Sequence, residues 1–331
     1  MSKKPSRKKS TYEFHLNNIR ELKKDSDFLL EEIPNFNKKV FYTREDKKGW
    51  WMVTKQILIR KYIGLYLNVF GAEKNRKDLI FIDILSSNGM NKVTKSNRKD
   101  IFIFPGCSIS AALISQRKNI GFIEYYCNDR EPKNRKVLAS RFKALNDSNK
   151  LERRINYEID LSNKKIDSND WIMEIIDEIN DKYDFKHCLI IIDNEGMDIL
   201  FDVIKKIRNE LKYADLIINL QSQSIARSLN TSKAERFFCR RPYEDLKREE
   251  ILPFYKKCLE KFGYKSQEIK VSGHNFFYYL LFCHRKEVSG EWMRIIKDYR
   301  ERRFCDWHDE NVKQFWDIVA EKIKTIEDFI K

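Results

Sequence analysis

The pattern of apolar and polar positions predicts helices and short buried strands that alternate along most of this 331-residue chain. From Trp50 to Phe70, apolar residues recur every three or four positions and Gly71 follows, which predicts a helix and its end. The next apolar run, 79–84, is short and predicts a buried strand. Further helices are predicted near 108–115, 132–145, 172–179 and 203–211, and further strands at 121–129, 155–160, 188–193 and 215–220. This alternation predicts an α/β fold with a doubly wound, mostly parallel sheet.

The pattern changes after residue 220. Two helices are predicted at about 232–240 and 244–262, and Asp198 is a candidate cap for the helix before them. The strands 268–272 and 276–283 follow, separated by only three residues. That gap is too short for a helical crossover, so the two strands must form an antiparallel hairpin. A Rossmann-like sheet that ends in such a hairpin resembles the layout of class I methyltransferases.

This layout divides the chain into three parts. Residues 48–290 form the predicted methyltransferase-type domain, with a helical insertion at about 228–264. Residues 1–47 form a leading segment whose first 24 residues are strongly basic, which predicts a partly disordered arm. Residues 291–331 form a C-terminal helical extension.

Composition adds a partner class and a compartment. Lysine and arginine total 65 against 50 acids, a formal charge of +15 that favours a polyanion such as nucleic acid. A lysine-rich composition spread over solvated faces is the alternative. The seven cysteines are isolated, as in a reducing cytoplasm, and they predict no metal site. No apolar run has the length of a membrane span and the start has no signal core, so a soluble cytoplasmic protein is expected.

The candidate chemistry lies at the ends of the predicted strands. Carboxyl ends of neighbouring parallel strands meet in one crevice, so Asp83, Asp129, Asp160 and Asp193 should converge there. Asp129 is the candidate for binding ribose hydroxyls and Asp160 for the adenine amino group. The candidate cofactor contacts in the first turn are Asp83, Leu85, Ser86 and Gly89. Capping of the following helices is the alternative role for these acids.

The acceptor side is predicted around Asp193 and Glu195. Either carboxylate could deprotonate or orient an acceptor, or both could hold magnesium. The segment lacks the Asp-Pro-Pro-aromatic signature of enzymes that methylate base amino groups. The candidate nucleic-acid contacts are four arginines near aromatic residues: Arg227, Arg236, Arg240 and Arg241. A solvated helix with its aromatic residues packed inward is the alternative.

Several motifs together resemble the three-Cys-motif partner protein (TcmP) family. They are the helix 55–66, the turn 81–89, the segments 105–108, 128–142 and 192–198, then 214–219, 225–227 and 278–286. The family pattern has glycine or proline where this chain has Ser87, Asn88, Ser108 and Asn194. The resemblance carries over Asp83, Gly89, Gly106, Asp129, Asp193, Gly196 and Arg227. It implies a methyltransferase-like fold and a protein partner that bears a three-cysteine motif.

The leading hypothesis is an S-adenosylmethionine-dependent methyltransferase that acts on nucleic acid, with RNA as the favoured class. The first alternative is a non-catalytic nucleic-acid-binding or assembly subunit that keeps the fold without a working cofactor turn. The second is a magnesium-dependent nuclease built from Asp83, Asp193 and Glu195.

Overall fold

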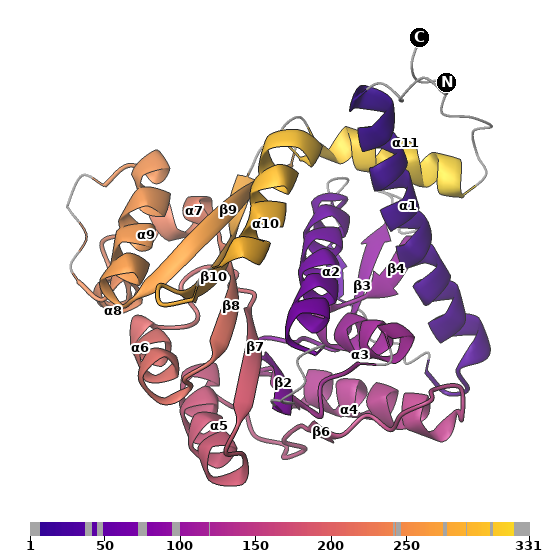
Figure 1. Ribbon diagram of the computed structural model, residues 1–331, viewed down its shortest axis with the longest axis horizontal. Helices are drawn as coiled ribbons and strands as arrows, with labels where there is room; N and C mark the ends of the chain where they lie inside the picture. Colours follow the sequence, from indigo (N-terminus) through magenta and orange to yellow (C-terminus); the bar gives the residue numbers. More distant parts are fainter. Residues whose placement is uncertain are drawn as a thin grey trace.

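A seven-stranded sheet forms the centre of the computed structural model (Figure 1). The structure describes residues 7–36, 42–44, 49–71, 78–94, 100–118, 120–240, 242, 246–273, 277–288, 290–304 and 307–320. The strand order is β6-β5-β2-β7-β8-β10-β9. The strands are β2 (Asp78–Asp83), β5 (Glu124–Cys127), β6 (Tyr157–Glu158), β7 (Lys186–Ile192), β8 (Ala214–Leu220), β9 (Tyr264–Ser272) and β10 (Phe277–Arg285). β6, β5, β2, β7 and β8 run parallel, whereas β10 is antiparallel to both β8 and β9. The predicted fold class and the terminal hairpin are confirmed.

The apolar runs form central strands because both faces of the sheet are covered. In β2, Leu79 and Phe81 pack on one face, and Ile80 and Ile82 pack on the other. This alternation is the period of two that a strand imposes on its side chains. β6 has only two residues, so the strand predicted at 155–160 is much shorter than expected.

Helices cover the two faces of the sheet in separate layers. One layer holds α2 (Trp51–Phe70), α3 (Cys107–Lys118) and α4 (Pro132–Asp147). The other holds α5 (Ser168–Lys182), α6 (Phe201–Glu210), α7 (Ser222–Ala226), α8 (Ser232–Phe238), the 3-10 turn η2 (Arg248–Glu250) and α9 (Ile251–Lys261). Asp198 was the candidate cap of α6, but the N-cap of that helix is Leu200.

A small second sheet is a feature that the apolar pattern did not predict. Its order is β1-β3-β4, with β1 (Tyr42–Arg44), β3 (Met90–Thr94) and β4 (Asp100–Pro105). β3 and β4 follow β2 in the sequence and precede α3, and they pair antiparallel with each other. β1 pairs parallel with β3. Buried Phe102 and Phe104 face the core from β4.

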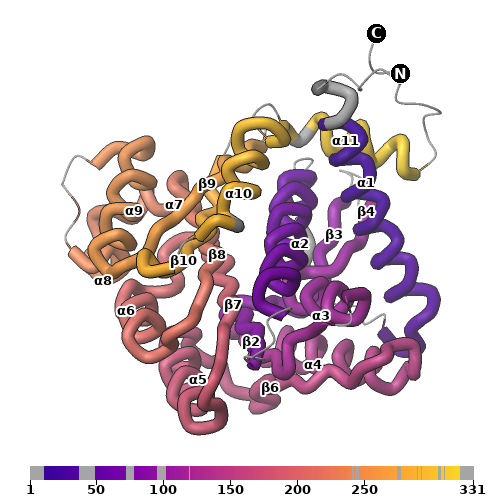
Figure 2. The backbone as a smooth tube through the Cα atoms, viewed as in Figure 1, coloured from indigo at the N-terminus to yellow at the C-terminus, as the bar shows by residue number. Residues whose placement is uncertain are grey.

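The N-terminal segment is helical from Arg7, which corrects the expectation of a partly disordered arm for this part; residues 1–6 of the arm lie outside the described residues. α1 (Arg7–Asp27) continues into η1 (Phe28–Glu32) and buries Leu16, Ile19 and Leu22. It lies beside α11 (Asp309–Val319) from the far end of the chain (Figure 2). His15 stacks on Trp307 with ring centroids 3.5 Å apart. Between β10 and α11 the chain forms three short helices, η3 (Glu291–Met293), α10 (Arg294–Asp298) and η4 (Tyr299–Arg303).

Candidate functional site

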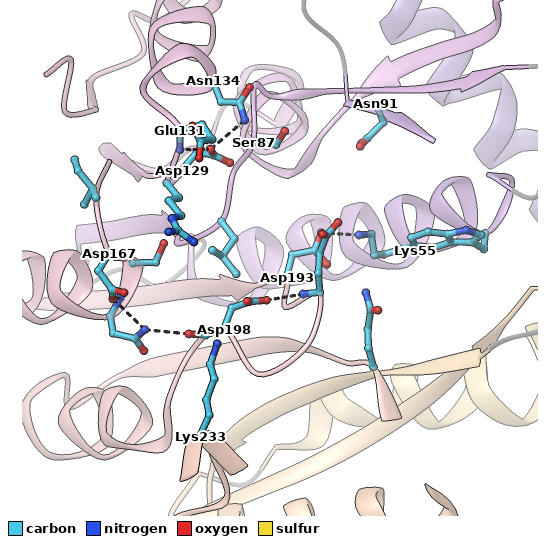
Figure 3. Close-up of a pocket in the computed structure, with 18 residues that line it drawn as sticks. Lys55, Ser87, Asn91, Asp129, Glu131, Asn134, Asp167, Asp193, Asp198 and Lys233 are labelled. Carbon is cyan, nitrogen blue, oxygen red and sulfur yellow. Dashed lines mark hydrogen bonds and ion pairs between the residues drawn. The ribbon is translucent and has the colours of Figure 1, made fainter. Parts of the chain in front are cut away.

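A cavity of about 380 Å³ opens at the carboxyl ends of β2, β5 and β7 (Figure 3). Its size lies near the lower end of the range for small-molecule sites, roughly 300–1,000 Å³. The wall includes Leu85, Asp129, Asp193 and Glu195, so four predicted site residues meet there. We call it the strand-end cavity.

The turn after β2 is held by its own hydrogen bonds. The Ser86 backbone N–H and hydroxyl both donate to the Asn128 carbonyl, at 2.7 and 2.8 Å. Ser86 is therefore buried beneath the cavity wall, and Ser87 lines the cavity in its place. Ser87 has φ 52°, a left-handed conformation that costs an L-residue about 1–2 kcal/mol. A serine thus occupies a backbone conformation that suits glycine.

Gly89 is required by its surroundings. Its φ is 81°, and a Cβ there would lie 2.5 Å from Leu138 Cδ1. Its carbonyl accepts a hydrogen bond of 2.8 Å from the Gly106 N–H, and this ties the turn to the start of α3. Gly89 is buried and does not line the cavity, so its part in the site is structural.

Asp83 lies one layer below the cavity rather than in its wall. It is 1% exposed, and its carboxylate accepts a 2.5 Å hydrogen bond from the Ser108 hydroxyl. Burial raises the pKa of Asp83 to about 7, and the nearby charge of Asp193 acts in the same direction. In this position Asp83 links β2 to α3.

Asp129 follows β5 and lines the cavity with its carboxylate (Figure 3). Oδ1 accepts hydrogen bonds from the Glu131 N–H at 2.8 Å and the Asn134 side chain at 3.0 Å. Among the described residues, no hydrogen bond is made to Oδ2. Burial raises the pKa of Asp129. One oxygen therefore fixes the side chain while the other can accept a ligand hydroxyl.

Asp160 lies outside the strand-end cavity. It accepts a 2.6 Å hydrogen bond from the Ser162 N–H and closes a local turn, and hydrogen bonding to Ser162 lowers its pKa. The next segment lines this side of the cavity instead, with Ile166, Asp167 and Asn169. Asp167 also caps α5 by accepting from the backbone N–H groups of residues 169 and 170. A capping aspartate before the helix at 172–179 was the available sequence signal.

Asp193 is held from two sides. Lys55 Nζ donates to its Oδ2 at 2.5 Å, and the Asn219 side-chain amide donates to its Oδ1 at 2.8 Å. The exposed fractions are 11% for the Lys55 side chain and 22% for that of Asp193. Lys55 was not predicted as a site residue, although a lysine within the apolar start of a helix is a usable signal. The pair fixes Asp193 at the cavity wall with its charge balanced.

Glu195 lies beyond Asp193 in an exposed turn. Its backbone N–H donates to Asp198 Oδ2 at 2.9 Å, so Asp198 closes this turn. Both carboxylates line the cavity, together with Lys233 from α8. The wall as a whole holds six acids and three bases, so it favours a cationic ligand.

The predicted arginines lie apart from the cavity wall. Arg227, Arg236 and Arg240 are exposed, and Arg241 lies outside the described residues. Arg240 stacks over the Phe254 ring at 4.2 Å. Phe237 and Phe238 are fully buried, so these rings pack inward and present no surface for base stacking.

The magnesium-nuclease alternative lacks its metal site in the described part of the chain. There the structure brings together no group of three or more His, Cys, Asp or Glu side chains that could hold a metal ion. Asp83 is buried beneath Ser108, and Asp193 is paired with Lys55. Within the same residues, no helix combines the length and apolarity needed to cross a membrane.

Comparison with known proteins gives no family. No protein-family model matches the chain, and no curated protein does. Solved structures with a similar fold include Trm1 from Pyrococcus horikoshii with S-adenosyl-L-methionine, at 11% identity and a TM-score of 0.38. That match covers 69% of this chain, which spans 54% of the length of Trm1.

Two O-methyltransferases are also similar. The enzyme from Bacillus cereus in complex with SAH has 11% identity and a TM-score of 0.36, over 84% of this chain and 91% of that one. TomG from Streptomyces achromogenes in complex with SAM has 8% identity and a TM-score of 0.38, over 86% and 92%. The likeness concerns the fold alone, and the strand order itself shows the mostly parallel sheet with a terminal antiparallel hairpin that the sequence predicted. The resemblance to the TcmP family stays a prediction.

Proposed function

We propose that this protein is an S-adenosylmethionine-dependent methyltransferase that acts on nucleic acid. The observation that carries the proposal is Asp129, which lines the strand-end cavity from the end of β5 with one carboxylate oxygen available. A carboxylate in this place can accept both hydroxyl hydrogens of a ribose.

The donor set of the cavity fits this cofactor. Six acids against three bases suit its sulfonium and amino groups, which are cationic. Ser87 and Leu85 would lie along its amino-acid part, Asp129 would hold the ribose, and the 166–169 segment would border the adenine. When bound, the cofactor supplies a methyl group activated by the positively charged sulfur.

On the acceptor side, Asp193 would orient the attacking atom. Both of its oxygens already accept hydrogen bonds, from Lys55 and Asn219, so its position is fixed before substrate enters. Glu195 lies at the exposed rim, where a carboxylate can take the proton that the acceptor loses. Transfer then yields methylated acceptor, demethylated cofactor and a proton.

The nucleic-acid part of the proposal depends on charge. The chain carries +15, and the exposed cations Arg227, Lys233 and Arg236 lie on α7 and α8 or their ends. Such cations can contact phosphates while a nucleotide enters the cavity. The TcmP resemblance adds a proposed protein partner with a three-cysteine motif.

The rival is a binding or assembly subunit with an inactive cofactor turn. The specific observation in its favour is Ser87, whose left-handed φ of 52° is strained in the turn that should contact the cofactor.

Transfer of a labelled methyl group distinguishes the two. The full chain is incubated with S-adenosylmethionine labelled in its methyl group and with mixed RNA or DNA. We expect label in the polynucleotide, and we expect Asp193→Ala to reduce the rate by about 100-fold or more through lost positioning. Bound cofactor without transfer to either nucleic acid would overturn the proposed acceptor, and absence of both cofactor binding and transfer would favour the rival.

A further inference from the structure

A second cavity lies among the helices that cover the α2 and α3 face of the sheet, and it shares no lining residue with the strand-end cavity. It has a volume of about 600 Å³ and is lined by residues of α1, α2, α3, α10 and the start of η4. Figure 1 shows α2 and α3 between α1 and α10 on this side of the sheet. We call it the basic groove, because its wall holds five cationic side chains: Lys24, Arg60, Lys61, Arg117 and Lys118.

The floor of the basic groove is a buried carboxylate shared by two arginines. Asp25 is 3% exposed and accepts a 2.6 Å hydrogen bond from Arg60 and two from Arg117. Arg60 also donates to the Ser110 hydroxyl at 3.1 Å. Arg60 is buried, but the Arg117 side chain is 49% exposed at the groove. Two guanidinium groups on one carboxylate leave a net positive charge in a fixed position.

Lysines add to this excess around the rim. Lys61 is paired only loosely, with Glu21 at 3.7 Å, and Lys118 donates to the neutral side chain of Asn68 at 2.6 Å. In the described part of the chain, no carboxylate pairs with Lys24 or Lys118.

The cations of the basic groove are close enough to affect one another. Burial is the main cause that lowers the pKa of Lys61, and the charges of Arg60 and Lys118 act in the same direction against Glu21. An anion in the groove would relieve this crowding of like charges. Arginine forks match phosphate oxygens in geometry, and lysine supplies a further point charge.

We propose that the basic groove binds the phosphate backbone of a nucleic acid. This deepens the nucleic-acid part of the proposed function, on which it rests, and it adds a second contact surface, apart from the cations of α7 and α8. α2 joins the two sites, since Lys55 lines the cavity and Lys61 lines the groove. Six helical residues separate them by about 9 Å along the axis and place them on different sides of it.

Salt-dependent binding of a fluorescein-labelled, mixed-sequence 20-nucleotide RNA or DNA tests this inference. The groove variant replaces Lys24, Lys61 and Lys118 by glutamine in the full chain. The control variant makes the same change at the exposed Lys143, Lys164 and Lys257, which lie outside the groove. Both variants therefore lose the same net charge. We expect the groove variant alone to bind at least about tenfold more weakly and to lower the slope of log affinity against log salt by about 2–3.

Equal binding by wild type and groove variant, or an equal loss in the control variant, would overturn the inference. Binding of poly-glutamate without binding of polynucleotide would overturn it too, in favour of an acidic protein partner. If the triple variant does not melt cooperatively, Lys24→Glu with Lys118→Glu replaces it and must weaken binding at least as much.

Cofactor titration of the same variants separates this inference from the proposed function. A wild-type protein that binds no S-adenosylmethionine, yet binds polynucleotide through Lys24, Lys61 and Lys118, would refute the methyltransferase and leave the basic groove standing.

Discussion

The strand-end cavity and the basic groove lie on different sides of α2. A buried carboxylate lies beneath each, and the two carboxylates have different partners. Beneath the cavity, Asp83 has a hydroxyl partner, Ser108, and its pKa is raised to about 7. Beneath the groove, Asp25 is held by two guanidinium groups. Burial favours the protonated form of Asp83, whereas two guanidinium groups pair with the Asp25 carboxylate. The cavity wall holds more acids than bases and the groove wall holds more bases than acids, so the two proposed sites suit ligands of opposite charge.

Replacing the buried aspartate by asparagine should therefore have opposite effects on the free energy of unfolding at Asp25 and at Asp83. Asp25→Asn leaves two guanidinium groups without a counterion and should lower the free energy of unfolding by about 3–5 kcal/mol. Asp83→Asn should raise it above pH 7. Between pH 4 and 7 the unfolded carboxylate has lost its proton while the folded one keeps it, so the wild type becomes less stable as pH rises.

Denaturant unfolding at several pH values measures both effects. The stability gap between Asp83→Asn and wild type should widen by up to about 1.4 kcal/mol per pH unit across this range. A gap that does not change with pH, or a gain in stability for Asp25→Asn, would break the comparison.

Of the two predicted cofactor acids Asp129 and Asp160, only Asp129 should affect cofactor affinity. Asp129→Ala removes charge-assisted hydrogen bonds to the ribose and should weaken S-adenosylmethionine binding by about 30–100-fold, or 2–3 kcal/mol. Asp160→Ala is the matched control, since Asp160 lies outside the cavity and should change affinity less than twofold. Calorimetric titration of both variants measures the affinities. Equal losses of affinity would contradict the role of Asp129 in binding the ribose.

The turn after β2 should tolerate glycine at position 87 but not a β-branched residue. Ser87→Val places a branched side chain at φ 52° and should cost about 1–2 kcal/mol of stability. Ser87→Gly relieves that strain and should keep cofactor affinity. Melting temperatures and titrations of the pair test this, and a Val variant as stable as wild type would contradict it.

The smallest effect is expected where the two sites should be independent. Neutralising Lys24, Lys61 and Lys118 should leave S-adenosylmethionine affinity within about twofold of wild type, since none of the three lines the strand-end cavity and salt screens their charges. A larger change at 0.15 M salt would mean that the cavity and the groove are coupled.

Much of the fold could be predicted because the apolar runs of β2, β7 and β8 are continuous and short. The same reasoning brought Leu85, Asp129, Asp193 and Glu195 to the cavity, since parallel strand ends meet at one edge. It failed for Asp83 and Asp160, because the direction of a side chain after a strand depends on partners such as Ser108 and Ser162.

Contacts between distant parts of the chain account for the rest. Lys55 meets Asp193 across 138 positions, and Arg117 meets Asp25 across 92. β1 pairs with β3 at residues nearly fifty positions away, and each strand is too short to show a clear alternation. The basic groove has no local sequence signature, because it forms only when α1, α2 and α3 pack together. The small sheet has none either, because it forms only when β1, β3 and β4 pair.

The central claim is that the acidic cavity, and not the basic groove, binds S-adenosylmethionine. Equilibrium dialysis of the labelled cofactor against the full wild-type chain, at salt concentrations from 50 to 300 mM, tests it most directly. The account predicts one saturable site per chain that demethylated cofactor displaces and that salt changes by less than about threefold, because the contacts are local and partly buried. Absence of saturable binding, or binding lost with salt as at an exposed charged surface, would contradict it.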